Sequence, residues 1–345
     1  MAGIFTDAAP DRWGRTLLQR REAVAARRAN RQARRLDEWD FLLGAHDEVR
    51  IGALRLRDTQ TGQFLDTGPV AVPPMARLRD LEYWAQEFER RAPRPTLEEE
   101  QALAMLLALG SSLGGARPKA NFSAKGPVLW IAKFPSRDDL HDVGGWEYLL
   151  TRVAAEAGII VAETKLLRLG SQHRTFASRR FERDGSARHL YASAMTLAGK
   201  RDGVDASYLD VAEAIEQHGD ASSIEAELEQ LFRRVVLNVL AANRDDHLRN
   251  HGFLRTRRGW RLAPAFDLNP ASTNPEHTLA LDESNRDPDL SVAIATAPLY
   301  RLSDSRAQGI VGEVRAGLAT WRRVAREIKL PDEEVDILAA AFAGA

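Results

Sequence analysis

A group of polar side chains follows a long amphipathic helical pattern in the second half of the chain. Its members fall within eight residues: Asn243, Asp245, Asp246, His247 and Asn250. After an apparent hairpin comes a further carboxylate, Asp267. Phosphoryl transfer needs such a set, because one carboxylate must orient the attacking hydroxyl while an amide oxygen and another carboxylate hold Mg²⁺ against the ATP phosphates. The residue types therefore favour phosphoryl-transfer chemistry.

The order of these groups along the chain is also informative. Protein kinases place a catalytic-loop Asp, an Asn five residues later and the Asp of a metal loop in this order. A metal hydrolase built from Asp245, Asp246 and His247 is an alternative. It is less favoured because Mg²⁺ would need additional carboxylates elsewhere, and no second cluster has convincing spacing.

A loop rich in glycine and serine precedes the first apolar strand pattern. The segment 110–119 holds three glycines, two serines and a terminal lysine, Lys119. Backbone N–H groups of such a loop could face phosphates. Its spacing is not that of a Walker A motif, and a flexible connector has the same composition.

A lysine stands inside the apolar run 127–134, which predicts a strand. Lys133 must either extend its ammonium group to solvent at a strand edge or find anionic partners. The helical pattern 142–158 that follows carries Glu147 beside its apolar positions. Kinases pair a strand lysine with a helix glutamate to align the lysine on the nucleotide phosphates. A solvated glutamate is equally consistent with the pattern.

The remaining patterns divide the chain into two parts. Strands are expected at 159–169 and 175–183, after which the composition changes from strand-rich to helix-rich. We therefore predict an α+β fold with a mixed amino-terminal lobe, residues 1–184, and a mostly helical carboxy-terminal lobe, residues 185–345. Adenine commonly binds at such a junction. Further patterns predict a strand at 49–57, a central helix at 224–242, a hairpin at 251–265, and closing helices at 305–328 and 332–343.

Composition excludes several classes of function. The chain has 345 residues, a formal net charge of -1 and 44% hydrophobic residues, so bulk electrostatics do not favour nucleic acid or membrane. It has no cysteine, which excludes disulfides and thiolate chemistry. No apolar run approaches the roughly 20 residues of a membrane span, and a soluble cytoplasmic protein is the default expectation. The arginine-rich helix predicted at 11–36 is either a solvated basic helix or a contact for a partner or DNA.

Five pieces of the chain together resemble the HipA-like serine/threonine kinases of bacterial toxin–antitoxin systems, and the resemblance covers nearly the whole chain. They are Pro10–Arg15, the loop from Ser112 to Lys119, Trp130–Pro135, Asn243–Asn250 and Pro264–Pro270. The resemblance implies a two-lobed, protein-kinase-like fold that uses ATP and Mg²⁺. The pattern Asn-x-Asp-Asp-His-x-x-Asn is its most specific part.

The resemblance also implies roles for single residues. Asp245 matches the catalytic aspartate, Asn250 and Asp267 match the Mg²⁺ ligands, and Lys133 matches the lysine on the phosphates. The loop over the nucleotide corresponds to Gly114, Gly115, Ala116, Arg117, Pro118 and Lys119. The hinge that borders adenine corresponds to Arg179, Arg180 and Phe181.

Two further positions are assigned in the same way. His247 is expected to organise the loop beside the nucleotide, with a neutral imidazole bonded to a backbone carbonyl. Ser112 matches the serine that family members autophosphorylate, which expels the loop from the site. A phosphate adds about -1.5 to -2 charges at neutral pH and would disfavour a loop that faces ATP phosphates. Arg117 stands where many members carry Gln.

The family implies a toxin that phosphorylates an aminoacyl-tRNA synthetase. Its partner would be a helix-turn-helix, HipB-like antitoxin, which would link it indirectly to operator DNA. Because the Trp-Gly-Arg segment lies at residues 13–15, the usual strand-rich amino-terminal subdomain is expected to be missing. Either a separate HipS-like protein supplies it, as for shortened HipT-like kinases, or the chain start is truncated.

Two alternatives remain. One is a small-molecule kinase, since antibiotic and lipid kinases share a catalytic loop with the pattern Asp-x-x-x-x-Asn. The other is a catalytically inactive, kinase-like partner-binding protein. The second is less favoured because Lys133, Asp245, Asn250 and Asp267 are all present.

Overall fold

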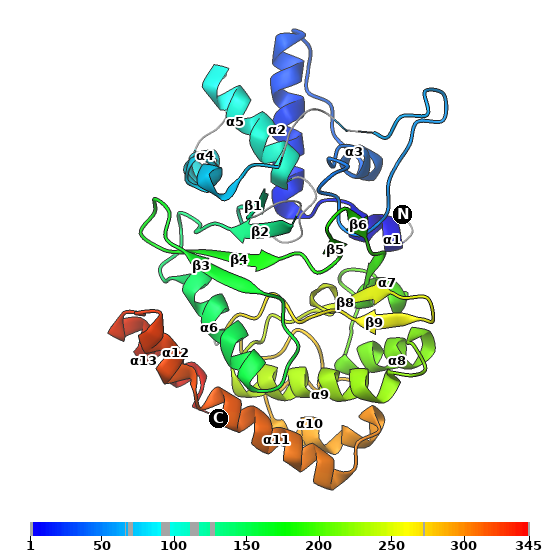
Figure 1. Cartoon of the computed structure of the whole chain (residues 1–345), viewed down its shortest axis with the longest axis vertical. Coiled ribbons are helices and arrows are strands. Elements are labelled where there is room, and N and C mark those ends of the chain that lie inside the picture. The colour runs from blue at the N-terminus through cyan, green and yellow to red at the C-terminus, as the bar shows by residue number, and fades with distance from the viewer. Residues whose placement is uncertain are drawn as a thin grey trace. The chain divides into compact units, whose positions relative to one another are not determined.

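The computed structural model describes residues 3–65, 67, 72–90, 97–110, 117–124, 128–271 and 273–343. The chain forms two compact units (Figure 1). Unit 1 comprises Met1–Gly144 and Thr164–Tyr191, and unit 2 comprises Gly145–Glu163 and Ala192–Ala345. The loop residues predicted at Ser112, Gly114, Gly115 and Ala116 lie outside the described residues.

A four-stranded antiparallel sheet forms the centre of unit 1, in the order β1-β2-β4-β3 (Figure 1). Its strands are β1 (Lys119–Ser123), β2 (Leu129–Lys133), β3 (Thr164–Leu167) and β4 (Thr175–Arg179). A short pair, β5 (Arg183–Asp184) and β6 (Ala187–Arg188), follows β4. The predicted ranges 127–134, 159–169 and 175–183 thus each contain a strand.

Unit 1 also contains helices. They are α1 (Gly3–Ala8), α2 (Arg12–Arg28), α3 (Glu38–Leu43), the 3₁₀ turn η1 (Met75–Arg77), α4 (Leu78–Arg90) and α5 (Leu97–Gly110). Figure 1 shows α2 beside α5 above β1. Leu17 and Leu106 are buried in the same apolar cluster as Phe122 and Trp130 of the sheet. The indole Nε1 of Trp13 donates to the Lys119 carbonyl at 3.0 Å.

The arginine-rich segment is mainly used inside unit 1. The helix ends at Arg28, earlier than the predicted residue 36, and Asn30 follows in the left-handed region with φ 48°. Several of its arginines pair with acids of the same unit: Arg15 with Glu38, Arg28 with Glu100, Arg31 with Glu22, and Arg34 with Asp40. The segment is therefore a braced element of the unit and not merely a solvated basic helix.

The strand predicted at 49–57 is wrong. Only an isolated bridge between Arg57 and Phe64 forms there. The fully buried Arg50 donates to the backbone carbonyls of Leu42 and Ala45 at 2.8 and 2.7 Å. The backbone here is shaped by the hydrogen bonds of the buried Arg50 guanidinium and not by the hydrogen bonds of a strand ladder.

Unit 2 is built around the long helix α9 (Ile224–Leu240), whose apolar face is buried. Its other helices are α6 (Val143–Glu156, which starts in unit 1), α7 (Ala194–Leu197), α8 (Tyr208–His218), α10 (Leu290–Ala295), α11 (Asp304–Leu318), α12 (Trp321–Glu327) and α13 (Asp332–Ala341). Two 3₁₀ turns are η2 (Leu248–Asn250) and η3 (Ala297–Tyr300). Figure 1 shows α8 and α11 beside α9.

The predicted hairpin is confirmed as β8 (Gly252–Arg255) and β9 (Trp260–Leu262), with β7 (Tyr191–Ser193) beside β8. The helix predicted at 305–328 is instead two helices, α11 and α12. The hydroxyl of Thr320 donates to the Gly317 carbonyl at 2.7 Å, and such local bonding competes with the helical ladder. Sheets and helices together confirm the mixed α+β class.

The division between units differs from the single boundary that we predicted after residue 184. Residues 145–163 belong to unit 2, because Leu150, Val153 and Ala157 join the same core as Leu231 of α9. The two functional lobes stay a prediction. None of the described helices is both long enough and apolar enough to cross a membrane.

Candidate active site

The candidate catalytic loop begins where α9 ends. Ala242 adopts the left-handed region with φ 50°, and the N–H of Asn243 donates back to the Asn238 carbonyl at 2.9 Å. The Asn243 side chain also donates to the Asn238 side-chain oxygen at 2.9 Å. The chain therefore leaves the helix in a fixed direction, and a rigid core helix positions the loop that follows.

Asp246 is the buried centre of this loop. Its Oδ2 accepts from the Tyr208 hydroxyl at 2.9 Å and from the Asn238 Nδ2 at 2.7 Å, and it lies 2.9 Å from the His251 Nε2. Burial alone would raise the pKa of Asp246, but the nearby His251 and the hydrogen bonds from His251 and Tyr208 hold that pKa below its usual value. The ionised carboxylate therefore anchors the loop.

Asp245 is exposed, in contrast to its neighbour. Partial burial raises the pKa of Asp245; His247 lowers it, whereas the negative charges of Asp267 and Asp246 raise it further. The structure thus brings Asp245 and Asp267 close enough for their charges to act on each other. A raised pKa makes a carboxylate a better proton acceptor near neutral pH.

The second carboxylate lies in the segment that follows β9. Asp267 is held in the left-handed region at φ 60°, which is uncommon for a residue other than glycine. The N–H of Asn269 donates to the Asn243 side-chain oxygen at 3.3 Å, and its Nδ2 donates to Asp267 at 3.3 Å. These bonds connect the segment to the catalytic loop.

Asn250 ends the loop and is 8% exposed. Its N–H donates to the His247 carbonyl at 2.8 Å within the turn η2. The His247 ring, expected to bond a backbone carbonyl, has no partner at Nδ1 within the described part of the chain. His247 orders the loop through its backbone carbonyl, and the expected bond from its ring to a backbone carbonyl stays a prediction.

The donor set fits a hard divalent cation. Carboxylate and amide oxygens are the ligands that Mg²⁺ takes in proteins, and a cation would relieve the repulsion between Asp245 and Asp267. Among the described residues no three His, Asp or Glu side chains gather as a metal-binding cluster. The hydrolase alternative also loses Asp246, because three donors surround its buried oxygen.

A strand lysine and a helix glutamate were predicted to align the nucleotide phosphates. Lys133 ends β2 half-buried, with its Nζ 5.6 Å from the centroid of the Phe176 ring. Glu147 is buried in α6 of unit 2. The two residues belong to different units, so their pairing stays a prediction.

The described end of the predicted nucleotide loop is tied to unit 1. Arg117 donates to the Asp139 carboxylate at 2.9 Å, which gives this arginine a partner within the protein. The Pro118 carbonyl accepts from the Phe134 N–H at 2.8 Å. Lys119 is buried at the start of β1. These three residues therefore join the loop firmly to the sheet.

One side chain of the predicted hinge belongs to a buried hydrogen-bond network. Arg179 ends β4 opposite Trp130, and the Phe181 ring lies 6.4 Å from that of Tyr191. Arg180 is only 2% exposed and donates to Glu182, to the Asn121 side chain and to the Val49 carbonyl, each at 2.7 Å. The Arg180 side chain is thus committed to a buried network, and the expectation that residues 179–181 border adenine stays a prediction.

Several positioning residues escaped the sequence patterns. Tyr208, Asn238 and His251 are far apart in the chain or lack a motif, and only the bonds to Asp246 single them out. The doubled aspartate at 245 and 246 is the signal that could have indicated a separate anchoring carboxylate.

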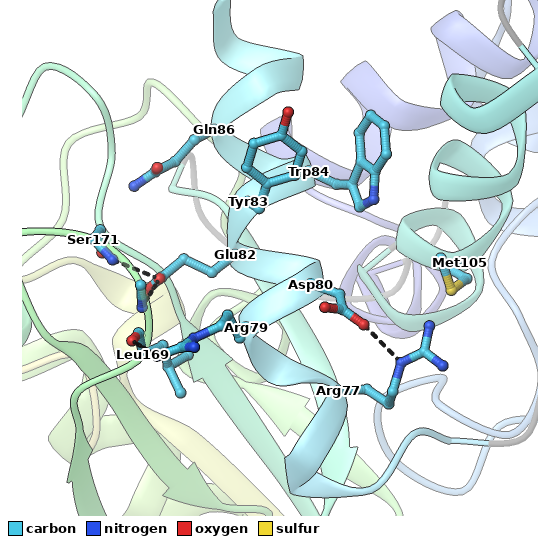
Figure 2. Close-up of a pocket in the computed structure, with 11 residues that line it drawn as sticks. Arg77, Arg79, Asp80, Glu82, Tyr83, Trp84, Gln86, Met105, Leu169 and Ser171 are labelled. Atoms are coloured by element: carbon cyan, nitrogen blue, oxygen red, sulfur yellow. Dashed lines mark hydrogen bonds and ion pairs between the residues drawn. The ribbon is translucent and has the colours of Figure 1, made fainter.

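Unit 1 also has a pocket of about 660 Å³ along α4, which no motif predicted. Figure 2 shows Glu82 pointing toward Ser171 on one side of the helix and Asp80 pointing toward Arg77 on the other. Glu82 accepts from the N–H groups of Gly170 and Ser171 at 2.8 and 3.0 Å. None of the predicted site residues lines this pocket.

Comparisons with known proteins agree with this geometry. A chain in the toxin–antitoxin complex of HipA, HipB and operator DNA from Shewanella oneidensis MR-1 superimposes with a TM-score of 0.63. The match covers 94% of this chain and 80% of that one, and at 15% identity it shows the fold alone. The Helicobacter pylori proinflammatory kinase CtkA gives a TM-score of 0.42 at 18% identity, covering 67% of this chain and 93% of that one, which is too low to establish a shared fold.

Sequence comparison is more specific. A presumed kinase of Haemophilus influenzae is 28% identical over 190 residues, which are 48% of this chain and 54% of that protein. The match thus spans about half the length of this relative. The family model of the HipA-like C-terminal domain matches residues 111–322, more than half of the chain. The chain therefore belongs to the HipA-like C-terminal domain family.

Proposed function

We propose that the chain is an ATP- and Mg²⁺-dependent serine/threonine protein kinase that acts as the toxin of a toxin–antitoxin system. The observation that carries the proposal is the joint placement in unit 2 of Asp245 and Asp267, whose charges act on each other. Asp245 lies in the loop that also carries Asn250, and a hydrogen bond from Asn269 ties the segment of Asp267 to that loop. Membership of the HipA-like family supports the same function.

Asp245 accepts the proton of the attacking hydroxyl in this proposal. It is exposed, while its neighbour Asp246 is buried and bonded on one oxygen by three donors. The loop therefore presents one carboxylate to a substrate and uses the other to hold its own shape. General bases contribute about 10² to 10⁴ in rate.

Asn250 and Asp267 would hold Mg²⁺, which when bound neutralises charge on the ATP phosphates. The buried Asn250 is fixed through its N–H to His247, and Asp267 is fixed by Asn269. Both oxygen donors are therefore presented from an ordered backbone.

The remaining nucleotide contacts belong to the same proposal. Lys133 and Glu147 would align the phosphates, and residues 114–119 would cover them. The hinge residues Arg179, Arg180 and Phe181 would border adenine. The half-buried position of Lys133 at the end of a sheet strand supports its part, because an ammonium group there favours an anionic partner.

The substrate and partners follow from the family. We propose an aminoacyl-tRNA synthetase as substrate, self-modification at Ser112, and a cytoplasmic location. We further propose a HipB-like antitoxin that links the kinase to operator DNA, and a HipS-like protein as a second partner. The likeness to the fold in the HipA, HipB and operator DNA complex supports the antitoxin.

The experiment is intact-mass and phosphopeptide analysis after incubation with Mg-ATP. Wild-type protein is expected to gain phosphate on Ser112, while Asp245→Asn and Ser112→Ala remain unmodified at that position. Transfer to an added synthetase should persist in Ser112→Ala. A wild-type chain that neither binds Mg-ATP nor transfers phosphate would contradict the kinase proposal and favour a partner-binding protein.

A further inference from the structure

One buried hydrogen bond closes the catalytic loop on itself. Asp246 directly follows the proposed base Asp245, and His251 directly follows the proposed metal ligand Asn250. The His251 Nε2 lies 2.9 Å from the Asp246 Oδ2, and the two residues are 2% and 4% exposed. We propose that the Asp246–His251 pair is a clasp that sets the spacing between Asp245 and Asn250, an inference that rests on the proposed kinase function.

The clasp joins the two ends of the reactive stretch. Asp245 and Asn250 lie on the part of the chain that the pair encloses, so their separation depends on how this short loop is closed. Within it, the backbone bond from Asn250 to the His247 carbonyl orders only the last turn. A hydrogen bond to an ionised carboxylate is roughly twice as strong as a neutral one, and burial strengthens it further.

Core helices of unit 2 hold the carboxylate half of the clasp. The Asn238 side chain reaches Asp246 from α9, and the Tyr208 hydroxyl reaches it from the start of α8. Tyr208 is fully buried. Because three donors converge on one oxygen, rotation of the carboxylate would break all three bonds together.

The imidazole half is held separately. The His251 carbonyl accepts from the Ala194 N–H at 2.7 Å, which ties the residue to α7. Its ring packs edge-on against Tyr208, with centroids 5.8 Å apart and an interplanar angle of 88°. Since Asp246 Oδ2 only accepts, the Nε2 of His251 donates. A glutamine could place an amide N–H in a similar position, whereas a leucine could not.

A positioning role makes a specific prediction for kinetics. Misplacing a catalytic group by about 1 Å can cost about 10²-fold in rate. Loosening the clasp should displace the base and the metal ligand together. It should therefore lower kcat and raise the Mg²⁺ concentration needed for half-maximal activity, while the affinity for adenosine without phosphates stays unchanged.

The test compares His251→Leu with His251→Gln in the full chain. His251→Leu should lose about tenfold or more in kcat and require more Mg²⁺, and His251→Gln should recover most of both. Tyr208→Phe removes one anchor and should have an intermediate effect. The matched control is Tyr300→Phe, because Tyr300 is an equally buried tyrosine of unit 2 whose hydroxyl is hydrogen-bonded to none of the clasp residues. That control should retain wild-type kinetics.

Amide hydrogen exchange gives a readout that does not need activity. His251→Leu should speed exchange at residues 244–251 while the rest of unit 2 stays protected, and His251→Gln should restore the protection. Wild-type kinetics and wild-type exchange in His251→Leu would overturn the clasp. Equal defects in the leucine and glutamine variants would also overturn it, because they would indicate packing alone. If the wild-type chain transferred no phosphate, the kinase proposal would fail, and the exchange comparison would still decide the clasp.

Discussion

Arg180 in unit 1 and Asp246 in unit 2 are both almost completely buried charged residues, at 2% and 4% exposure, and each takes part in at least three hydrogen bonds. Arg180 reaches Glu182, Asn121 and the Val49 backbone, so it fixes an irregular segment to the end of a strand. Asp246 fixes a loop whose neighbouring residue, Asp245, is an exposed carboxylate. A buried charge thus marks an ordered backbone, and a candidate site arises where such an anchor stands beside an exposed reactive group.

The largest effect on activity is expected at the exposed carboxylate Asp245. Asp245→Asn should lower phosphoryl transfer by about 10² to 10⁴, with little change in the free energy of unfolding, because the side chain is exposed and the anchor remains. Turnover and urea unfolding are to be measured together. Asp282→Asn is the control and should keep wild-type turnover; Asp282 lies in a turn of unit 2, where its half-buried side chain accepts from the N–H groups of Ser284 and Asn285. Wild-type turnover in Asp245→Asn would remove this residue from the mechanism.

The second prediction breaks the network of unit 1. Arg180→Met leaves the buried Glu182 carboxylate without its main partner, and breaking such a pair costs about 3 to 5 kcal/mol. Urea unfolding measures the loss. The double variant Arg180→Met/Glu182→Gln should recover part of it, because no buried charge then remains unpaired. A loss below about 1 kcal/mol would show that the network is not an anchor.

The third prediction concerns acid sensitivity in unit 2. His277 is 2% exposed, and burial lowers its pKa to about 4. Neither ring nitrogen has a hydrogen-bond partner within the described segments. Because the folded pKa lies below that of the unfolded chain, about 6.5, the unfolded chain binds protons first as the pH falls. The stability that this difference contributes is present above pH 6.5 and is lost as the pH falls toward 4.

That loss amounts to about 3 kcal/mol over the whole window. Unfolding free energies of wild type and His277→Gln, measured at pH 7 and pH 5, provide the check. The variant should show a smaller drop than the wild type between these pH values. An equal drop in both proteins would assign the acid sensitivity to other groups.

The smallest effect is expected at an exposed ion pair. The Nε of Arg301 lies 2.8 Å from the Oε1 of Glu216, and the two side chains are 50% and 41% exposed. Solvent screens such a pair, so Glu216→Gln should change the unfolding free energy by less than about 1 kcal/mol. A loss as large as that of Arg180→Met would contradict the distinction between buried and exposed charges.

Local patterns predicted the parts of the fold that local forces determine. The apolar face of α9 and the β8–β9 hairpin were predictable because period and turn residues specify them. The strand expected at 49–57 failed because the buried Arg50 bonds to the backbone carbonyls of Leu42 and Ala45, which lie outside the strand pattern. The partners of Asp246 were likewise hidden, since Tyr208 and Asn238 meet it only after α8 and α9 have packed.

The candidate site shows the same limit. The order Asp245, Asn250 and Asp267 was readable as chemistry, and the structure supports the proximity of the two carboxylates. The buried network of the Arg180 side chain was hidden because a motif position does not reveal which way a side chain points. Burial and hydrogen-bond partners supply that information.

Calorimetric titration of the chain with a non-hydrolysable ATP analogue, in the presence and absence of Mg²⁺, tests the proposed magnesium–nucleotide site most directly. Asp267→Asn and the control Asp282→Asn are titrated in parallel. A magnesium–nucleotide site predicts binding that strengthens with Mg²⁺ in the wild type and in the control. It also predicts that Asp267→Asn loses this effect of Mg²⁺. No binding, or identical binding with and without Mg²⁺ in all three proteins, would contradict a magnesium–nucleotide site at this loop.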